Sequence, residues 1–124
     1  MPIYQNMYVQ VEVNGVPADC NTDRTHVITD NGFHPRWDTD LTFTITCPEL
    51  ALVMFRVMDE ETSHKDVMVA HYCLPFKCIQ TGYRMVALRD IHGDLVGDMS
   101  LFVHIKIESS ATKPTIETTM NTHL

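Results

Sequence analysis

The stretch Asp30-Asn31-Gly32-Phe33-His34-Pro35-Arg36-Trp37-Asp38 is the strongest fold signal in this chain. Its Asn-Gly dipeptide tolerates positive φ and marks a turn, and its proline favours an extended residue before it. Phe33 and Trp37, the single tryptophan, can pin such a turn against a core because each buries a large apolar area. Apolar residues then alternate with threonine over Leu41–Cys47. The stretch therefore predicts an ordered corner that leads into a β-strand. The corner is either purely structural, or Asp30 and Asp38 also border a functional edge of the sheet.

More strands are predicted on both sides of this corner. Met7–Val13 alternates between apolar and polar residues, as a half-buried strand does. Ala51–Met58 is apolar on both faces apart from Arg56, which predicts a central strand covered on both sides. The remaining strands are expected at residues 24–29, 67–73, 83–89 and 99–107. About seven strands with turn residues between them, and no long helical period, predict an all-β antiparallel β-sandwich. Residues 108–124 are rich in Ser and Thr and predict a disordered polar tail.

Composition narrows the classes of function. The 124 residues form one domain by length, and 44% hydrophobic with 20% charged residues is a globular composition. The net charge of -7 argues against a nucleic-acid binder and against unaided attraction to anionic lipid. No signal peptide is visible, and no apolar stretch approaches the roughly 20 residues of a membrane helix. The four cysteines form no CxxC pair and suggest reduced, mostly buried thiols in an intracellular protein.

The best candidate for a functional site is the acidic loop that follows the central strand. Asp59, Glu60, Glu61 and Asp66 fall within it, and Asp30 leads into the corner. If strand ends converge, these carboxylates crowd at one rim, and a hard cation such as calcium relieves their repulsion. The alternative is an ordinary solvated loop, because the EF-hand spacing is absent. No catalytic motif can be drawn, so no catalytic residue is predicted.

Several stretches together resemble the C2 domain of phosphoinositide-specific phospholipases C. The stretches are Val13–Cys20, Asn31–Asp38, Pro48–Val53, Gly82–Arg84 and Ser100–Ile105, in that order. The resemblance runs from about Asn6 to Ile107, so the domain is expected over residues 6–107. Delta- and eta-like members and the catalytically inactive phospholipase C-like subgroup all match. The structural signature residues are Asn31, Gly32, Phe33, Pro35, Trp37, Gly82, Tyr83 and Arg84.

The resemblance implies an eight-stranded sandwich in which loops at one rim hold calcium and dock on phospholipid. Carried over residue by residue, the calcium ligands fall on Asn6, Asp30, Asp59, Glu61 and Asp66. Asn6 stands where an aspartate is expected, and Glu61 replaces the second aspartate of an Asp-x-Asp pair. A lost ligand charge weakens calcium binding.

The family's first strand should precede Asn6, so about seven of the eight strands are expected and the chain is interpreted as truncated. An unpaired neighbouring strand would then reduce stability or cause self-association. The leading hypothesis is a C2 module of a phosphoinositide phospholipase C or its inactive relative, cytoplasmic and peripheral to membrane. It would target phospholipid surfaces with weak calcium dependence and pack against the other domains of its parent. An active parent would be a phosphoric diester hydrolase. The alternative is a calcium-independent scaffold that binds protein partners; neither hypothesis involves nucleic acid.

Overall fold

The computed structural model describes residues 6–29, 36–109 and 114–123. Most of these residues lie in β-strands, which are joined by turns and three short 3-10 helices. The strands are β1 (Asn6–Asn14), β2 (Asn21–Arg24), β3 (Ile28–Thr29), β4 (Arg36–Thr44), β5 (Leu52–Asp59), β6 (Val67–Pro75), β7 (Gly82–Arg89), β8 (Leu95–Ser109) and β9 (Pro114–His123). The 3-10 helices are η1 (Pro17–Asp19), η2 (Pro48–Leu50) and η3 (Phe76–Cys78). In the described ranges, no helix is long and apolar enough to cross a membrane.

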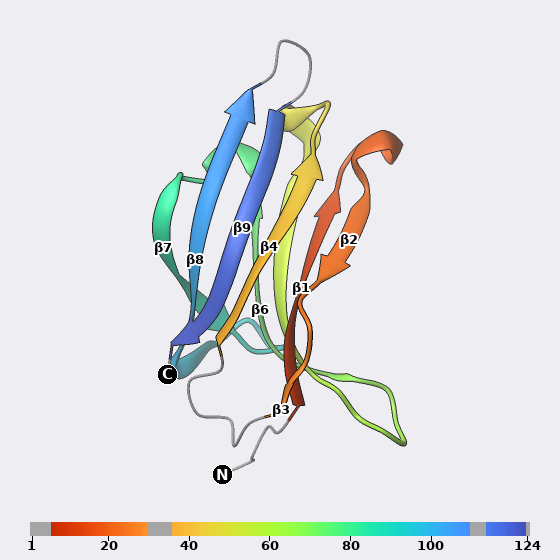
Figure 1. The fold of residues 1–124 in the computed structure, drawn as a ribbon, viewed down its shortest axis with the longest axis vertical. Helices are drawn as coiled ribbons and strands as arrows, with labels where there is room; N and C mark the ends of the chain where they lie inside the picture. Colours follow the sequence, from red (N-terminus) through yellow and green to blue (C-terminus); the bar gives the residue numbers. More distant parts are fainter. Residues whose placement is uncertain (1–5, 30–35, 110–113, 124) are drawn as a thin grey trace.

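The strands pair in the order β2-β1-β5-β6-β7-β8-β9-β4, with β3 also paired to β1. The pairs β1–β5, β5–β6, β7–β8, β8–β9 and β4–β9 are all antiparallel. Between β6 and β7 the register holds a single pair, His71 opposite Arg89. The sheet therefore divides there into two layers. Figure 1 shows β8, β9 and β4 in front of β6, with β1 and β2 to the right of β4. This confirms the predicted antiparallel β-sandwich.

The core forms where the apolar faces of the two layers meet. In β1, Val9, Val11 and Val13 are buried and lie opposite Val57, Phe55 and Val53 of β5. The predicted alternation of Met7–Val13 is thus confirmed, except that Tyr8 on the other face is also buried. The prediction that both faces of Ala51–Met58 are buried was wrong. β5 has neighbouring strands on both edges, but a second layer covers only one of its faces. On its other face Leu52 is 46% exposed, and Arg56 pairs with Glu12 of β1.

Residues 24–29 do not form the single strand that their composition predicts. β2 ends at Arg24 and β3 begins at Ile28. Between them the buried hydroxyl Oγ1 of Thr25 accepts a hydrogen bond of 3.0 Å from the backbone N–H of Val9. A side chain thus takes the place of one bond of the strand ladder, and the pairing with β1 is interrupted.

The prediction that residues 108–124 form a disordered polar tail is wrong for most of that segment. Residues 108 and 109 complete β8, and Pro114–His123 forms β9 between β8 and β4. Lys106 lies opposite Glu117, Ile107 opposite Ile116, and Thr44 opposite Thr115. The segment looked disordered because it lacks alternating apolar residues, but backbone pairing on both edges does not require them.

The expectation of mostly buried cysteines is also wrong. Cys20, Cys73 and Cys78 are exposed and Cys47 is half-buried, all four as free thiols. Cys73 lies opposite Met54 of β5, on the exposed face of β6, while its neighbours Tyr72 and Leu74 pack against the core. Cys78 lies in η3, where the polypeptide passes between the two layers.

Candidate functional rim

The residues expected to hold calcium are brought to one end of the sandwich by four strands. β1 and β3 meet where Asn6 lies opposite Thr29, and β5 ends where Asp59 lies opposite Met7. The loop between β5 and β6 starts from this end and projects beyond it, as Figure 1 shows at the foot of the molecule. We call Asn6, Asp59, Glu61 and Asp66 the rim. Asp30, the fifth predicted ligand, lies outside the described residues.

Asn6 and Asp59 are held together mainly through backbone groups. The N–H of Asn6 donates to Oδ1 of Asp59 at 3.1 Å, and the N–H of Glu60 donates to the carbonyl oxygen of Asn6 at 2.7 Å. Oδ1 of Asn6 accepts a hydrogen bond of 3.1 Å from the hydroxyl of Thr29. Asn6 therefore uses its side-chain oxygen to join β1 to β3.

Both oxygens of Asp66 accept hydrogen bonds from the protein. The phenol of Tyr8 donates to Oδ2, and the N–H of Glu61 donates to Oδ1 at 3.2 Å. The hydrogen bond from Tyr8, with that from the Glu61 backbone, lowers the pKa of Asp66. Burial is the main cause that raises the pKa of Tyr8, and the contact with Asp66 raises it further. The guanidinium of Arg24 lies 4.7 Å from the centroid of the Tyr8 ring and adds a cation–π contact.

The rim offers oxygen ligands of the kind that a hard cation prefers, but these oxygens do not form a preformed metal site. Among the described residues, no three His, Cys, Asp or Glu side chains lie close enough to hold a metal. Asp66 and Oδ1 of Asp59 are instead engaged with N–H and O–H donors. A cation would compete with these donors for the lone pairs of the carboxylates, which makes calcium binding costlier than at a preformed site.

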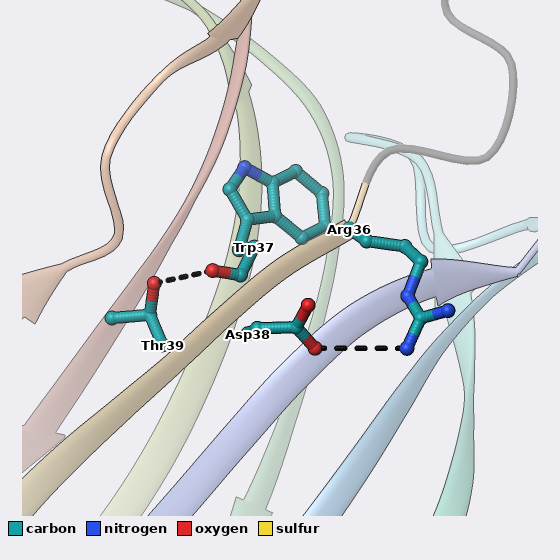
Figure 2. A network of polar contacts seen from close by, with 4 residues as sticks. All are labelled: Arg36, Trp37, Asp38 and Thr39. Atoms are coloured by element: carbon teal, nitrogen blue, oxygen red, sulfur yellow. Dashed lines mark hydrogen bonds and ion pairs between the residues drawn. The ribbon is translucent and has the colours of Figure 1, made fainter.

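Among the signature residues, Trp37 has a structural position. Its side chain is 2% exposed, and its Nε1–H donates to the carbonyl oxygen of Met7 at 3.0 Å. Asp38 has a φ of 42°, and the pairing of β4 with β9 shifts register between Arg36 and Thr39. Figure 2 shows the ion pair of Arg36 with Asp38, 3.8 Å long, and the bond from the Thr39 hydroxyl to the carbonyl oxygen of Trp37. Asn31, Gly32, Phe33 and Pro35 lie outside the described residues.

The second part of the signature opens β7. Gly82 has a φ of +94°, which an L side chain rarely adopts, so glycine is required there. Tyr83 is 70% exposed, and its ring stacks on Phe102 of β8 with centroids 5.5 Å apart. Arg84 donates two hydrogen bonds to the carbonyl oxygen of Thr81. These residues lie far from the rim along the chain and fix the turn into β7.

Sequence reasoning missed Asp19, which is 1% exposed. Its Oδ1 accepts bonds of 2.7 Å from both the N–H and the hydroxyl of Thr46, and its Oδ2 accepts one of 2.9 Å from the N–H of Cys47. Burial alone would raise the pKa of Asp19, but these hydrogen bonds outweigh it and lower the pKa. The sequence offered no signal, because the partners lie 27 or 28 positions away.

This two-layered antiparallel sandwich with an acidic rim at one end is the architecture of a C2 domain. Residues 4–91 match the C2 domain family, and the chain belongs to it. A solved structure agrees in fold: a C2 domain of plant extended synaptotagmin 1 superposes with a TM-score of 0.52. The match covers 97% of this chain and 96% of that one, at 12% sequence identity.

Its relatives in sequence come from the phospholipase C group. The chain is 44% identical over 100 residues to inactive phospholipase C-like protein 2 of Mus musculus, covering 81% of this chain and 9% of the relative. It is 43% identical over 110 residues to 1-phosphatidylinositol 4,5-bisphosphate phosphodiesterase delta-4 of Xenopus laevis, covering 89% of this chain and 14% of that protein. The chain thus spans only a small part of these relatives, and the resemblance to C2 domains of active and inactive members is confirmed.

Proposed function

We propose that this chain is the membrane-targeting and packing module of a phosphoinositide phospholipase C or phospholipase C-like protein, with only weak calcium dependence. On this proposal it acts in phosphoinositide signalling, on the cytoplasmic face of a membrane and peripheral to it. The C2 family match and the phospholipase C relatives support the module. The observation that carries the weak calcium dependence is the state of Asp66, whose two oxygens accept hydrogen bonds from Tyr8 and Glu61. This arrangement gives the β5–β6 loop a fixed shape without a metal.

Weak calcium dependence follows from ligand charge and from competition. Asn6 contributes a neutral oxygen where a carboxylate would add charge, and that oxygen already accepts a bond from Thr29. Calcium must also compete with the Tyr8 phenol for the lone pairs of Asp66. Sites with few charged ligands bind calcium with Kd values of about 10⁻⁴ to 10⁻³ M, and we place the rim in that range.

We expect that removing the Tyr8 hydroxyl strengthens calcium binding and that removing the Asp59 carboxylate abolishes it. Tyr8→Phe leaves Oδ2 of Asp66 without its O–H donor, so a cation no longer competes with that donor. Calorimetric titration should show a Kd several-fold lower for Tyr8→Phe and no heat for Asp59→Asn. Glu49→Gln is the matched control, since Glu49 is an exposed carboxylate in η2, at the other end of β5. Its Kd should equal that of the wild type.

Membrane binding is tested by co-sedimentation with phosphatidylserine–phosphatidylcholine vesicles. The wild type should sediment to a small extent in EGTA and more at millimolar calcium, and Tyr8→Phe should reach the same level at lower calcium. A micromolar Kd in the wild type would contradict the weak dependence proposed here. No sedimentation at any calcium concentration would reject membrane targeting and leave the calcium-independent protein scaffold as the function.

A further inference from the structure

A cavity of about 380 Å³ opens between the two layers, away from the rim, where β6 and β7 diverge. Its walls come from β5 to β8 and from the connection around η3. Phe55, Leu74, Val86 and Ile105 form an apolar lining, and Arg84 and Arg89 belong to the same lining on β7. A cavity of this size with apolar walls and a few polar groups has the character of a binding site.

One side of the cavity is an open sheet edge. β7 pairs with β8 along its length, from Gly82 opposite Ile105 to Arg89 opposite Leu95. Toward β6, only Arg89 has a strand partner within the described ranges. The remaining N–H and C=O groups on that edge can pair with an added strand, as edge strands do in peptide recognition.

The charge around the cavity is opposite to that of the chain. The chain carries a net charge of -7, yet the cavity lining contains two arginines and no aspartate or glutamate. Most other basic side chains are engaged: Arg56 with Glu12, Lys77 with Glu49, Lys106 with Glu108, Arg36 with Asp38, and Arg24 with the ring of Tyr8. Where the structure describes side chains, neither Arg84 nor Arg89 has a carboxylate partner.

Both guanidinium groups are positioned by backbone carbonyls. Nε and Nη2 of Arg84 donate to the carbonyl oxygen of Thr81 at 3.1 and 2.9 Å, and Nη1 of Arg89 donates to that of Gly93 at 2.7 Å. A guanidinium has five N–H donors, so each arginine keeps donors for a carboxylate. The two arginines are five positions apart along β7, or about 17 Å.

We propose that the cavity and the free edge of β7 together bind an extended acidic peptide of a protein partner. The peptide backbone adds to the free edge of β7, its apolar side chains enter the cavity, and carboxylates about five residues apart meet Arg84 and Arg89. The apolar lining selects the centre of the peptide, and the two fixed cations select its ends. The site is separate from the rim and needs no calcium.

The test uses the 124-residue chain and a fluorescein-labelled six-residue peptide with glutamate at both ends and Ile-Thr-Val-Thr between them. Fluorescence anisotropy should show saturable binding that weakens about tenfold or more in Arg84→Glu and in Arg89→Glu. Lys106→Glu makes the same charge change on the outer face of β8 and should leave binding unchanged. Arg84→Gln and Arg89→Gln, which keep polar side chains, should weaken binding in the same direction and guard against misfolding of the reversed variants. Circular dichroism confirms that each variant is folded.

Two altered peptides test the two parts of the recognition. Replacing both glutamates by glutamine should weaken binding as the arginine variants do. Methylating alternate backbone nitrogens should abolish binding, because an added strand needs those N–H groups. Equal loss in Lys106→Glu, unchanged binding of the methylated peptide, or no binding at millimolar peptide would each overturn the proposal. A second outcome would also overturn the proposal: the peptide does not bind, while phosphatidylserine vesicles bind the wild type and not the arginine variants. That result would assign this face to a membrane.

Discussion

Replacing Trp37 by alanine is expected to lower the free energy of unfolding by about 3–5 kcal/mol, the usual cost of removing a large buried aromatic side chain. The indole is 2% exposed and belongs to the core cluster. Its Nε1–H also donates to the carbonyl oxygen of Met7. Trp37 lies in β4 of one layer and Met7 in β1 of the other, so the substitution removes packing and a polar tie between layers.

A conservative variant separates the two contributions. Trp37→Phe keeps most of the apolar area but leaves the Met7 carbonyl without this donor, and should cost about 1–2 kcal/mol beyond the smaller loss of packing. Arg36→Ala, one residue earlier and exposed, should stay within about 0.5 kcal/mol of the wild type. Urea denaturation followed by far-UV circular dichroism suits all three, because Trp37 is the single tryptophan and the fluorescence signal disappears with it. A loss below about 1 kcal/mol for alanine would contradict the role of Trp37 as a tie between layers.

Replacing Asp19 by alanine is expected to cost about 3 kcal/mol, because two backbone N–H groups and a hydroxyl lose their acceptor in a buried site. The carboxylate lies in η1 and receives the bonds from Thr46 and Cys47, just after β4. It thus fixes the end of β4 against the connection that follows β1. Asp19→Asn should also destabilise the domain, since an amide nitrogen would face an N–H donor at one of these positions.

The same carboxylate makes stability depend on pH. Because its pKa is lowered in the folded state, the unfolded chain binds more protons between the folded-state value and the ordinary value of about 3.9. The stabilisation by Asp19 is therefore fully present above about pH 4 and is lost as the pH falls through the folded-state pKa. Asp19→Asn should flatten the acid limb of a Tm-against-pH profile measured by calorimetry. Asp23→Asn, an exposed carboxylate on β2, should leave that limb as in the wild type, and an equal effect of the two variants would contradict this assignment.

The sequence predicted those parts of the fold in which one face of a strand is buried. Met7–Val13 and the strand after the corner alternate because their apolar faces meet the opposite layer, and Trp37 was correctly expected in the core. β9 was missed because its residues are mostly Thr, Asn and Glu, with Ile116 and Met120 as the apolar exceptions. Its pairing with β4 and β8 is a backbone property that hydrophobic periodicity does not report.

The rim was predicted as a set of residues but not as a hydrogen-bonded arrangement. The end of the strand before the acidic loop correctly placed Asp59, which contacts Asn6. Asn6, Glu61 and Asp66 were named as ligands from the family resemblance, and their role in holding calcium stays a prediction. That Tyr8 donates to Asp66 could not be inferred, because the two residues are 58 positions apart and Tyr8 was assigned to a solvent-facing side. The open cavity between β6 and β7 depends on how two strands diverge, and no short sequence pattern encodes that divergence.

The position of β9 has a consequence for how quickly this domain folds. β4 is completed at Thr44, but the strand that pairs with it begins with Pro114, and Thr44 lies opposite Thr115. Every hydrogen bond of that ladder joins parts of the chain that are distant in sequence, so the loop-closure entropy must be overcome before the ladder stabilises anything. This high contact order favours folding in milliseconds to seconds. During that time, the β-edge of β4 is available to other chains, and β9 acts as the native competitor that prevents aggregation there.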